Sequence, residues 1–396
     1  MAIEGLIGRA PINGNDLDRV IMGTVIQDVN TSNVARESAL GAGIPNNVPA
    51  HTVTQACISS NQAITSAVEL IRTGQAKIIM AGGTETMSDI PIRFRKKFRQ
   101  KLLDARKYKS ISDFLKFFKG LRPSHLLPEI PSISEFSTGE TMGESCDKMA
   151  ARFGISREAQ DEYALRSHQL AAKATNEGWL DPELLPAAVP PDFDTIEHDN
   201  TFREDTSMEK LQKLSPAFIK PHGTITAGNS SALTDGASAS LIMEKQEALD
   251  RGLEPKAILK AYTYVAQDPE DELLLGPAYA TPQVLDMMGL ELADIDVFEF
   301  HEAFAGQILT VLKALNSDSF AKENLDRDKK VGDIPMEKFN CWGGSLSLGH
   351  PFGATGTRLV TTAANRLHHE DGELALVAAC AAGGQGHAII LERFNG

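Results

Sequence analysis

The sequence predicts an α/β protein made of two similar halves, each with a sheet that helices cover on both faces. The segments 76–81 and 374–379 are continuous apolar runs, which is typical of strands buried on both sides. Helical apolar periodicity precedes each run, over residues 62–71 and 355–367. At 396 residues the chain is long enough for two or three domain-sized units with a substantial core.

An internal near-repeat supports this organisation. In the first half, Cys57 precedes the helical pattern and Gly82-Gly83 follows the strand. In the second half, His350 precedes the helical pattern and Gly383-Gly384 follows the strand. Two halves that face each other across a pseudo-dyad would bring these four segments together, so each half is expected to supply a reactive side chain to one site.

Further segments complete the two halves. Residues 235–243 are expected to form the last strand of the first half, after a long intervening region. In the second half we expect a helix over residues 280–288 and a strand over residues 296–300 that leads into His301. We therefore divide the chain into an N-terminal half (1–90 and 222–249), a loop domain (91–221) and a C-terminal half (250–396).

The loop domain differs in composition from the two halves. Its parts are a basic helical stretch (93–122), a Pro-rich crossing (Pro123, Pro128, Pro131), an amphipathic helix (157–177) and an irregular Asp/Pro stretch (180–205). The net charge of the chain is −14, which disfavours nucleic acid as the main partner. The basic stretch holds five Arg and seven Lys against two Asp, a net charge of +10 that calls for a local explanation.

Several classes of protein are disfavoured by composition. The four cysteines include no paired C-x-x-C spacing, which argues against a zinc site or a disulfide scaffold and fits a reduced compartment. No apolar run approaches the roughly 20 residues of a membrane span, and the first residues lack the features of a signal or transit peptide. We find no dinucleotide fingerprint, phosphate loop or metal-ligand cluster, so no prosthetic group is expected.

Four residues in separate motifs are candidates for catalysis. Cys57 lies in Gln-Ala-Cys-Ile-Ser-Ser-Asn-Gln-Ala, Cys380 in Ala-Ala-Cys-Ala-Ala-Gly-Gly-Gln-Gly, His301 in His-Glu-Ala-Phe and His350 in Gly-His-Pro-Phe-Gly. A nucleophilic thiol, a histidine that deprotonates it and a second thiol for proton transfer suit carbon–carbon bond chemistry on a thioester. Because Cys57 precedes a helix, we expect the helix dipole to lower its pKa. The alternative is that these side chains are ordinary core residues.

These motifs resemble those of the thiolase family, in the same order and over nearly the whole chain. The stretch from Trp342 to Gly356 matches the family throughout, and the His-Glu-Ala-Phe motif is similar to that of trifunctional-enzyme β-subunits. The resemblance implies a thiolase fold, with two similar α/β halves in a five-layered α-β-α-β-α arrangement and an inserted loop domain. It also implies a 3-ketoacyl-CoA thiolase (acetyl-CoA C-acyltransferase) of fatty-acid β-oxidation.

The resemblance assigns a role to each catalytic candidate. It implies that Cys57 is the nucleophile that is acylated, and that His350 removes the proton of this thiol. Cys380 would be the acid/base that exchanges a proton with the α-carbon of acetyl-CoA. Most thiolases carry Asn where this chain has His301, which is therefore expected to supply a ring N–H to an oxyanion hole or to position a water there. Glu302 would orient His301 or would be a solvated carboxylate at a helix start.

Further binding residues follow from the same resemblance. Backbone N–H groups of Cys57 and Ala382 would form a second oxyanion hole. Met142 and Ser231 match positions that line the pantetheine channel of coenzyme A, so CoA and acyl-CoA are the expected ligands. The alternatives are a biosynthetic acetoacetyl-CoA thiolase, a non-catalytic acyl-CoA or lipid carrier on the same fold, and a cysteine hydrolase, in which the second thiol would have no role.

Partners and location are implied in the same way. We expect a homodimer or larger assembly and consider a hydratase/dehydrogenase α-subunit as a partner. The basic stretch 93–122 is expected to be a partly amphipathic helical projection that docks on a membrane surface or on that partner. The alternative is a solvated lid whose charges attract CoA phosphates. The protein would be cytoplasmic if bacterial, or in the mitochondrial matrix or at the inner-membrane surface if eukaryotic.

One feature departs from the family. Thiolases normally begin with an apolar strand that ends in Arg-Thr-Pro, followed by a helix, and this chain starts inside the equivalent of that helix. We expect the missing strand to leave an unpaired sheet edge and an incomplete core layer, and we interpret it as an artefact of the start site or of a fragment.

Overall fold

The structure is a computed structural model that describes residues 1–129, 134–189 and 191–396. The first of its two large sheets has the strand order β2-β1-β3-β8. The four strands are β1 (Arg19–Gly23), β2 (Ala50–Val53), β3 (Ile78–Glu85) and β8 (Gly236–Met243). Strands β1, β2 and β3 are parallel, and β8 is antiparallel to β3. The predicted last strand of the first half is therefore present.

The second sheet repeats this topology. Its order is β10-β11-β12-β9, with β10 (Val297–Phe300), β11 (Leu374–Ala381), β12 (Gln385–Arg393) and β9 (Ala257–Ala266). Strands β10 and β11 are parallel and β12 is antiparallel to β11, as β1, β3 and β8 are in the first sheet. The repeat seen in the sequence is therefore a repeat of sheet topology.

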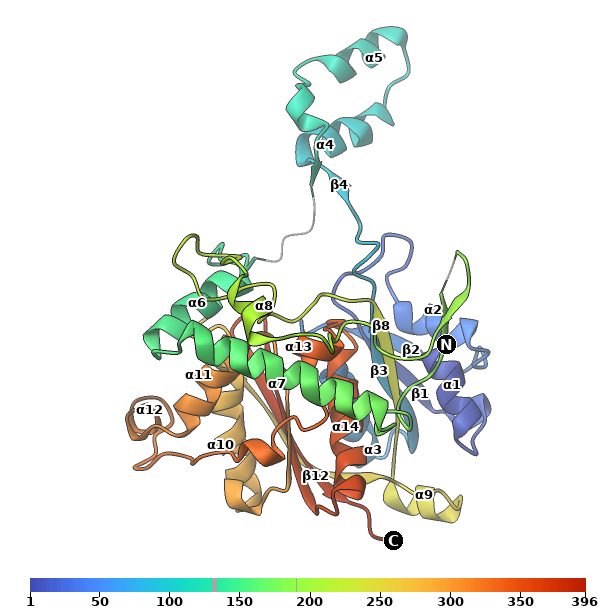
Figure 1. The fold of residues 1–396 in the computed structure, drawn as a ribbon. Coiled ribbons are helices and arrows are strands. Elements are labelled where there is room, and N and C mark those ends of the chain that lie inside the picture. Colours follow the sequence, from blue (N-terminus) through green and yellow to red (C-terminus); the bar gives the residue numbers. More distant parts are fainter. Residues whose placement is uncertain (130–133, 190) are drawn as a thin grey trace.

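Helices lie between the two sheets and outside each of them (Figure 1). The central layer holds α3 (Ser59–Arg72) and α14 (Thr355–His369), which contact each other. Helix α14 packs on both sheets, and α3 packs on the first sheet and reaches β9 of the second through a hydrogen bond between Thr65 and Tyr264. Helices α1 (Ala2–Arg9) and α2 (Val34–Gly41) cover the outer face of the first sheet, and α10 (Gly276–Met288) and α11 (Ala305–Leu315) lie beside the second. This is the five-layered arrangement that the resemblance to thiolases implies.

The central helices are buried because both sheets pack against them. In α14 the buried positions are mostly small or threonine residues, among them Gly356, Thr357, Thr362 and Ala363, so the helix can approach α3 and both sheets closely. A Cβ on Gly356 would lie 2.0 Å from the side-chain oxygen of Asn61 in α3. The sequence pattern predicts both helices, but this close contact sets how near their N-terminal ends lie.

The two glycine pairs differ in position. Gly383 and Gly384 form the turn between β11 and β12 and both have positive φ, as expected for a pair that follows a strand. Gly82 and Gly83 instead lie inside β3, paired with β1. A Cβ on Gly83 would lie 1.8 Å from the carbonyl oxygen of Gly353. The first pair therefore allows a close approach between β3 and the loop that follows His350, and the prediction that it ends the strand is wrong.

The intervening region adds helices over one side of the body. These are α6 (Met142–Arg152), α7 (Arg157–Asn176) and α8 (Met208–Gln212), with a small sheet of β6 (Ala187–Val189) and β7 (Asp194–Ile196). The predicted amphipathic helix 157–177 corresponds to α7. Shorter elements elsewhere are α9 (Lys245–Asp250), α12 (Asp318–Asn324) and α13 (Ser345–Leu348). Pro131 of the predicted Pro-rich crossing lies outside the described residues.

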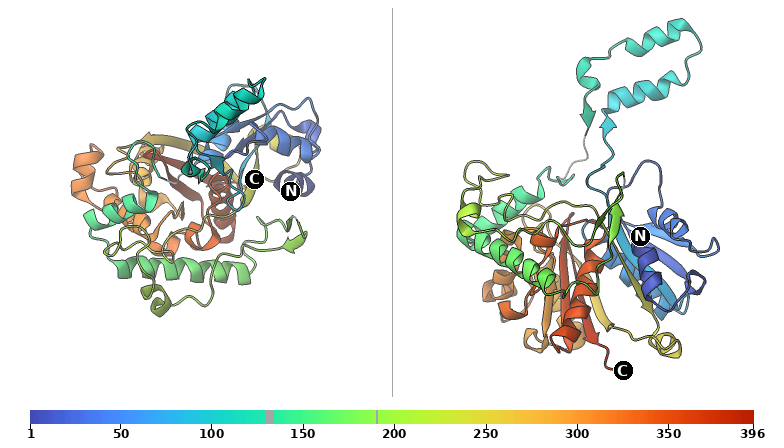
Figure 2. Two further views of the ribbon diagram at one scale, coloured as in Figure 1. Left: turned by 90° about the horizontal axis from the view of Figure 1, so that it is seen from above. Right: turned by 45° about the vertical axis from the view of Figure 1, so that its right-hand side comes forward.

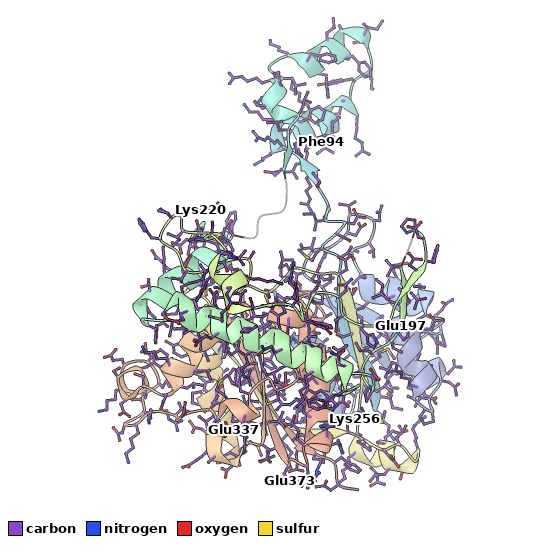
Figure 3. The ribbon with its side chains drawn as sticks, viewed as in Figure 1. Phe94, Glu197, Lys220, Lys256, Glu337 and Glu373 are labelled. Atoms are coloured by element: carbon purple, nitrogen blue, oxygen red, sulfur yellow. The ribbon has the colours of Figure 1, made fainter. Side chains whose placement is uncertain are left out.

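The basic stretch forms a helical hairpin that projects from the body (Figure 2). Its helices are α4 (Lys96–Ala105) and α5 (Ile111–Phe118), and a two-stranded sheet of β4 (Arg93–Phe94) and β5 (Pro128–Glu129) closes its base. Phe94 is labelled at this base in Figure 3, where side chains extend from the hairpin on all sides. No residue between Arg93 and Arg122 is fully buried, so both the basic and the aromatic side chains of the hairpin stay at least partly exposed.

The outer edges of the two sheets differ. In the second sheet β9 pairs with the outer edge of β12, whereas no strand among the described residues pairs with the outer edge of β8. A cavity of about 190 Å³ lies along this edge and is lined by residues 236–239 of β8 together with Glu183 and Asp199. The expected unpaired edge is therefore present. No described helix is long and apolar enough to cross a membrane.

Candidate active site

Cys57 lies in a tight turn between β2 and α3. Ala56 before it has a φ of 46°, which is uncommon for a residue other than glycine and turns the thiol out of the strand direction. The hydroxyl of Ser59 accepts a hydrogen bond from the backbone N–H of Gln55 (2.8 Å) and donates to the carbonyl of Ala56 (2.7 Å), which holds the turn. Cys57 is partly exposed as a residue, but its thiol group is enclosed by protein.

His350 reaches the same place from the other half of the molecule. Gly349 before it has a φ of 89°, and a Cβ there would lie 2.7 Å from Thr234, so only glycine fits. The Nδ1 atom of His350 is 2.7 Å from the hydroxyl of Thr355. That hydroxyl donates its own proton to the carbonyl of Pro351 (3.2 Å), so it accepts from Nδ1–H. The Nε2 atom of His350 therefore carries a free lone pair.

His301 follows β10 and stacks beside His350. Its backbone N–H donates to the carbonyl of Ala378 (2.8 Å), and the ring centroids of the two histidines are 4.0 Å apart. The Nδ1 atom of His301 is 2.9 Å from the hydroxyl of Ser345. Both Nε2 atoms are buried and have no hydrogen-bond partner in the described part of the chain. One ligand atom each from Cys57, His301 and His350 lies within 4.8 Å of the others.

The second thiol and the loop after it complete the cluster. Cys380 is buried near the end of β11, and its pKa is affected by the charge of Cys57, so the two thiols are neighbours. The backbone N–H groups of Ala382 and of Cys57 itself form hydrogen bonds to the Cys57 thiol. The structure therefore brings all four predicted catalytic side chains to one place.

Comparison with known proteins identifies the family. The model for the thiolase N-terminal domain matches residues 1–246, and that for the thiolase C-terminal domain matches residues 253–393. The chain belongs to the thiolase family.

Individual relatives agree with this assignment. The chain is 59% identical to the mitochondrial trifunctional enzyme subunit beta of Bos taurus over 99% of its own length and 82% of the relative's. It is 52% identical to a probable 3-ketoacyl-CoA thiolase of Caenorhabditis elegans, over 100% and 88% of the two chains. Human mitochondrial 3-ketoacyl-CoA thiolase, solved in complex with CoA, superposes with a TM-score of 0.83 at 30% identity, over 99% and 90% of the chains.

The pKa of Cys57 in this thiolase differs from the expected one. Burial raises the pKa of Cys57 to about 11, and the N–H groups of Ala382 and Cys57 oppose this only in part. Helix α3 begins at Ser59, two residues beyond the thiol. The loss of hydration therefore outweighs the helix dipole, and the prediction of a lowered pKa is wrong.

The other reactive groups are also held neutral. Burial lowers the pKa of His350 to about 3, and the nearby positive charge of Arg358 acts in the same direction. Burial, His350 and Arg358 together lower the pKa of His301 well below its usual value. Burial also raises the pKa of the Cys380 thiol. At neutral pH the resting site therefore holds two thiols and two uncharged imidazoles.

Glu302 is an anchor for the loops around the site rather than a solvated carboxylate. It is fully buried. Oε1 accepts hydrogen bonds from the Tyr163 hydroxyl (2.7 Å) and the Asn340 amide (2.8 Å). Oε2 accepts from the Ser167 hydroxyl (2.8 Å) and the backbone N–H of Leu346 (3.1 Å). Glu302 thus ties α7 to the segment that carries His350.

The two residues expected to line the CoA channel, Met142 and Ser231, lie near the catalytic side chains on different segments. Met142 begins α6 and packs against the hydrophobic cluster that includes Cys380 and Phe304. Ser231 donates its backbone N–H to the carbonyl of Ala303 (3.0 Å), two residues after His301. These positions are compatible with a channel that leads to the thiols.

Sequence analysis missed three residues that contact the catalytic histidines or their partners. Thr355 contacts His350, Ser345 contacts His301, and Arg358 donates to the Ser345 hydroxyl (2.8 Å). Ser345 and Thr355 lie in the stretch from Trp342 to Gly356 that matches the family, and Arg358 lies two residues beyond it, but only the fold shows which atoms they touch. The Cys57, His301 and His350 atoms are also ligand types that zinc accepts. The neighbouring positive charge of Arg358 opposes a cation at that point.

Proposed function

We propose that this chain is a 3-ketoacyl-CoA thiolase of fatty-acid β-oxidation. It would cleave 3-ketoacyl-CoA with CoA to give acetyl-CoA and an acyl-CoA shortened by two carbons. The observation that supports this most is the meeting of two thiols and two imidazoles from four distant segments. Cleavage of a carbon–carbon bond next to a thioester needs one thiol to hold the acyl group and another acid to protonate the leaving carbon.

In the first half-reaction the Cys57 sulfur attacks the 3-keto carbon while its proton moves to the free Nε2 of His350. Neutral starting groups fit this order, because the proton leaves only as the new bond forms. The bond between C2 and C3 then breaks and acetyl-CoA departs as its enolate. The Nε2 atoms of His301 and of protonated His350, which have no hydrogen-bond partner among the described residues, would stabilise the negative charge on the enolate oxygen. Cys380 protonates the enolate carbon and is left as a thiolate.

In the second half-reaction the Cys380 thiolate takes the proton of an incoming CoA thiol. The CoA sulfur attacks the acyl group on Cys57, and the backbone N–H groups of Cys57 and Ala382 are placed to stabilise the oxyanion that forms. The acyl-CoA leaves as Cys57 recovers its proton from His350. Cys57 recovers its own proton through His350, and the CoA thiol proton replaces the one that Cys380 gave to acetyl-CoA, so the cycle closes without a further reagent. CoA is a substrate here, and we assign its pantetheine arm to a channel past Met142 and Ser231.

The other candidate functions are less well supported. A biosynthetic acetoacetyl-CoA thiolase would use the same residues in reverse, and the relatives named trifunctional enzyme subunit beta favour degradation. A non-catalytic carrier has no need for two neighbouring thiols and two unpartnered imidazole nitrogens. We extend the same proposal to location and assembly: a mitochondrial protein that works as a homodimer or larger, with a hydratase/dehydrogenase α-subunit as partner.

The decisive experiment combines a substrate comparison with trapping of the acyl-enzyme. CoA-dependent cleavage of acetoacetyl-CoA is compared with that of a long-chain 3-ketoacyl-CoA, and we expect the long-chain substrate to be cleaved efficiently. Mass spectrometry should find the acyl group on Cys57 in the wild type and in Cys380→Ser, and none in Cys57→Ser. An acyl group on Cys380 would reverse the assignment, and cleavage of acetoacetyl-CoA alone would favour the biosynthetic enzyme.

We also propose that the α4–α5 hairpin docks on an anionic membrane surface. Along α5 the apolar side chains of Ile111, Leu115 and Phe118 are 85%, 69% and 66% exposed. They recur at the spacing of one helix face, on a helix that lies at the end of the hairpin far from the body (Figure 1). A solvated lid gains nothing from such a stripe, whereas a lipid interface buries it.

The charge of the hairpin supports the same proposal. Each Lys or Arg near an anionic lipid surface contributes about 1 kcal/mol before screening, and this segment has a net charge of +10. The two helices are held together by Phe98 and Phe117, whose ring centroids are 5.9 Å apart, and by a hydrogen bond from Lys101 to the carbonyl of Lys116 (2.9 Å). The exposed stripe is thus presented on an ordered support.

Co-flotation with phosphatidylcholine vesicles, with and without phosphatidylserine, tests this proposal. We expect binding only with the anionic lipid, and its loss in Leu115→Ser/Phe118→Ser and in Lys96→Glu/Lys97→Glu. The matched control reverses the exposed Lys322 and Lys329 on the main body and should bind like wild type. If the hairpin variants float normally but show a raised KM for CoA, the hairpin is a lid. Selective loss of an α-subunit pull-down would instead make it a subunit contact.

A further inference from the structure

The hydroxyl of Ser345 lies between a catalytic histidine and a partly buried arginine. Ser345 is the first residue of α13 and is fully buried. Its oxygen is 2.9 Å from Nδ1 of His301 and 2.8 Å from the guanidinium of Arg358 on α14. Three segments from different parts of the second half therefore meet at one oxygen atom.

The proton positions in this contact follow from the chemistry of the groups. A guanidinium has only donors, so Arg358 must donate and the Ser345 oxygen must accept. The Ser345 proton then needs an acceptor, and in the described part of the chain its other contact is Nδ1 of His301. Because His301 is uncharged, Nδ1 accepts this proton only if the ring carries its own proton on Nε2.

The neighbouring histidine is fixed in the opposite form. The Thr355 hydroxyl donates to the carbonyl of Pro351 and so accepts from Nδ1–H of His350, which leaves its Nε2 as an acceptor. Two stacked imidazoles, 4.0 Å apart, thus present one N–H and one lone pair to the same space. Thiolysis needs both, because one group must take the Cys57 proton while another stabilises an oxyanion.

We propose that Ser345 and Arg358 are positioning residues that fix the His301 proton on Nε2 and so make this ring the hydrogen-bond donor of the site. The proposal rests on the function proposed above only for its catalytic consequence. Arg358 has a second effect, since its positive charge opposes protonation of both histidines. Together the contacts assign a donor role to His301 and a base role to His350 before substrate binds.

The proton position is measurable in the resting enzyme. Protein labelled with ¹⁵N only at histidine Nε2 is compared with the same preparation of His301→Asn, and the difference spectrum isolates the His301 signal. We expect the shift of a protonated, pyrrole-type nitrogen. A pyridine-type signal in the wild type overturns the proposal, whatever the activity of the enzyme. This measurement needs no substrate, so its failure is distinct from failure of the thiolase assignment.

A double-mutant cycle tests the catalytic consequence. Ser345→Ala should lower kcat about tenfold, the order of one hydrogen bond, with little change in KM. In the His301→Asn background the same substitution should have little further effect, because Ser345 acts through the ring. Ser347→Ala, on the same short helix and bonded to Gly344 rather than His301, is the matched control and should have equal effects in both backgrounds. An equal loss for Ser345→Ala in both backgrounds would show a merely structural role.

Discussion

Replacing Glu302 by Gln tests whether this buried carboxylate holds α7 and the segment before His350 together. The side chain accepts four hydrogen bonds, two at each oxygen. Glutamine has nearly the same shape, but it replaces one oxygen by an NH₂ group and removes the negative charge. The substitution thus changes the hydrogen-bonding pattern with little change in volume.

The magnitude follows from the four donors. If the NH₂ takes the place of Oε1, the Tyr163 hydroxyl can rotate to accept, but the Asn340 amide cannot turn because its oxygen already accepts from the Phe300 N–H (2.8 Å). If it takes the place of Oε2, the Ser167 hydroxyl can rotate, but the Leu346 N–H cannot. Either orientation leaves one buried donor facing another and weakens the charge-assisted bonds, at a cost of about 3–5 kcal/mol in the free energy of unfolding.

Urea unfolding at matched protein concentration, together with steady-state thiolysis, measures both consequences. We expect a clear loss of stability. We also expect a fall in kcat, because Leu346 directly follows Ser345 in α13 and the Ser345 hydroxyl contacts His301. Glu183→Gln, at a partly buried carboxylate remote from His301 that accepts two hydrogen bonds, controls for the general cost of such a substitution. If Glu302→Gln unfolds within about 1 kcal/mol of the wild type, the network argument fails.

Three further predictions concern the reactive groups and the core beside them. His301→Ala should reduce kcat by about 10²–10³-fold with a small change in KM, as for other oxyanion donors, and His301→Asn should recover part of it; an unchanged kcat would make the ring structural. Because the pKa of Cys57 is raised to about 11, the rate at which iodoacetamide labels it should rise about tenfold per pH unit from pH 8 to 10. Peptide mass spectrometry measures this rate, and a plateau below pH 8 would instead indicate a thiolate–imidazolium pair. Arg366 and Glu299 form a fully buried ion pair (2.7 Å), so Arg366→Met should lower the free energy of unfolding by about 3–5 kcal/mol. Adding Glu299→Gln should restore part of this loss, and equal melting temperatures for the wild type and Arg366→Met would contradict the prediction.

The sequence by itself determined the family, the repeat and the four reactive side chains. Cys57 and His350 each precede a helix with an apolar pattern, and each following strand is a continuous apolar run. These are local signals that side-chain periodicity makes readable without a structure. The outer edge of β8, with which no described strand pairs, was also predicted, but from the resemblance to thiolases and not from a local pattern.

Sequence patterns failed where several distant segments act on one atom. The pKa of Cys57 was expected to fall because the chain shows a helix after it, but not the protein that surrounds the thiol and removes its hydration. Glu302 was left between two roles because its four donors come from α7, the Asn340 turn and the loop before His350. The glycine pair in β3 was misplaced because its reason, the backbone of Gly353, lies in the other half.

Only the tertiary structure decided which of the two histidines is the hydrogen-bond donor and which is the base. Spacing along the chain identifies both rings but leaves the position of each ring proton open. Thr355 settles it for His350 from a position five residues along the chain, and Ser345 with Arg358 settles it for His301 from segments more than 40 residues distant. A proton is placed by the donors and acceptors within about 3 Å of the ring, and for His301 only folding brings them there.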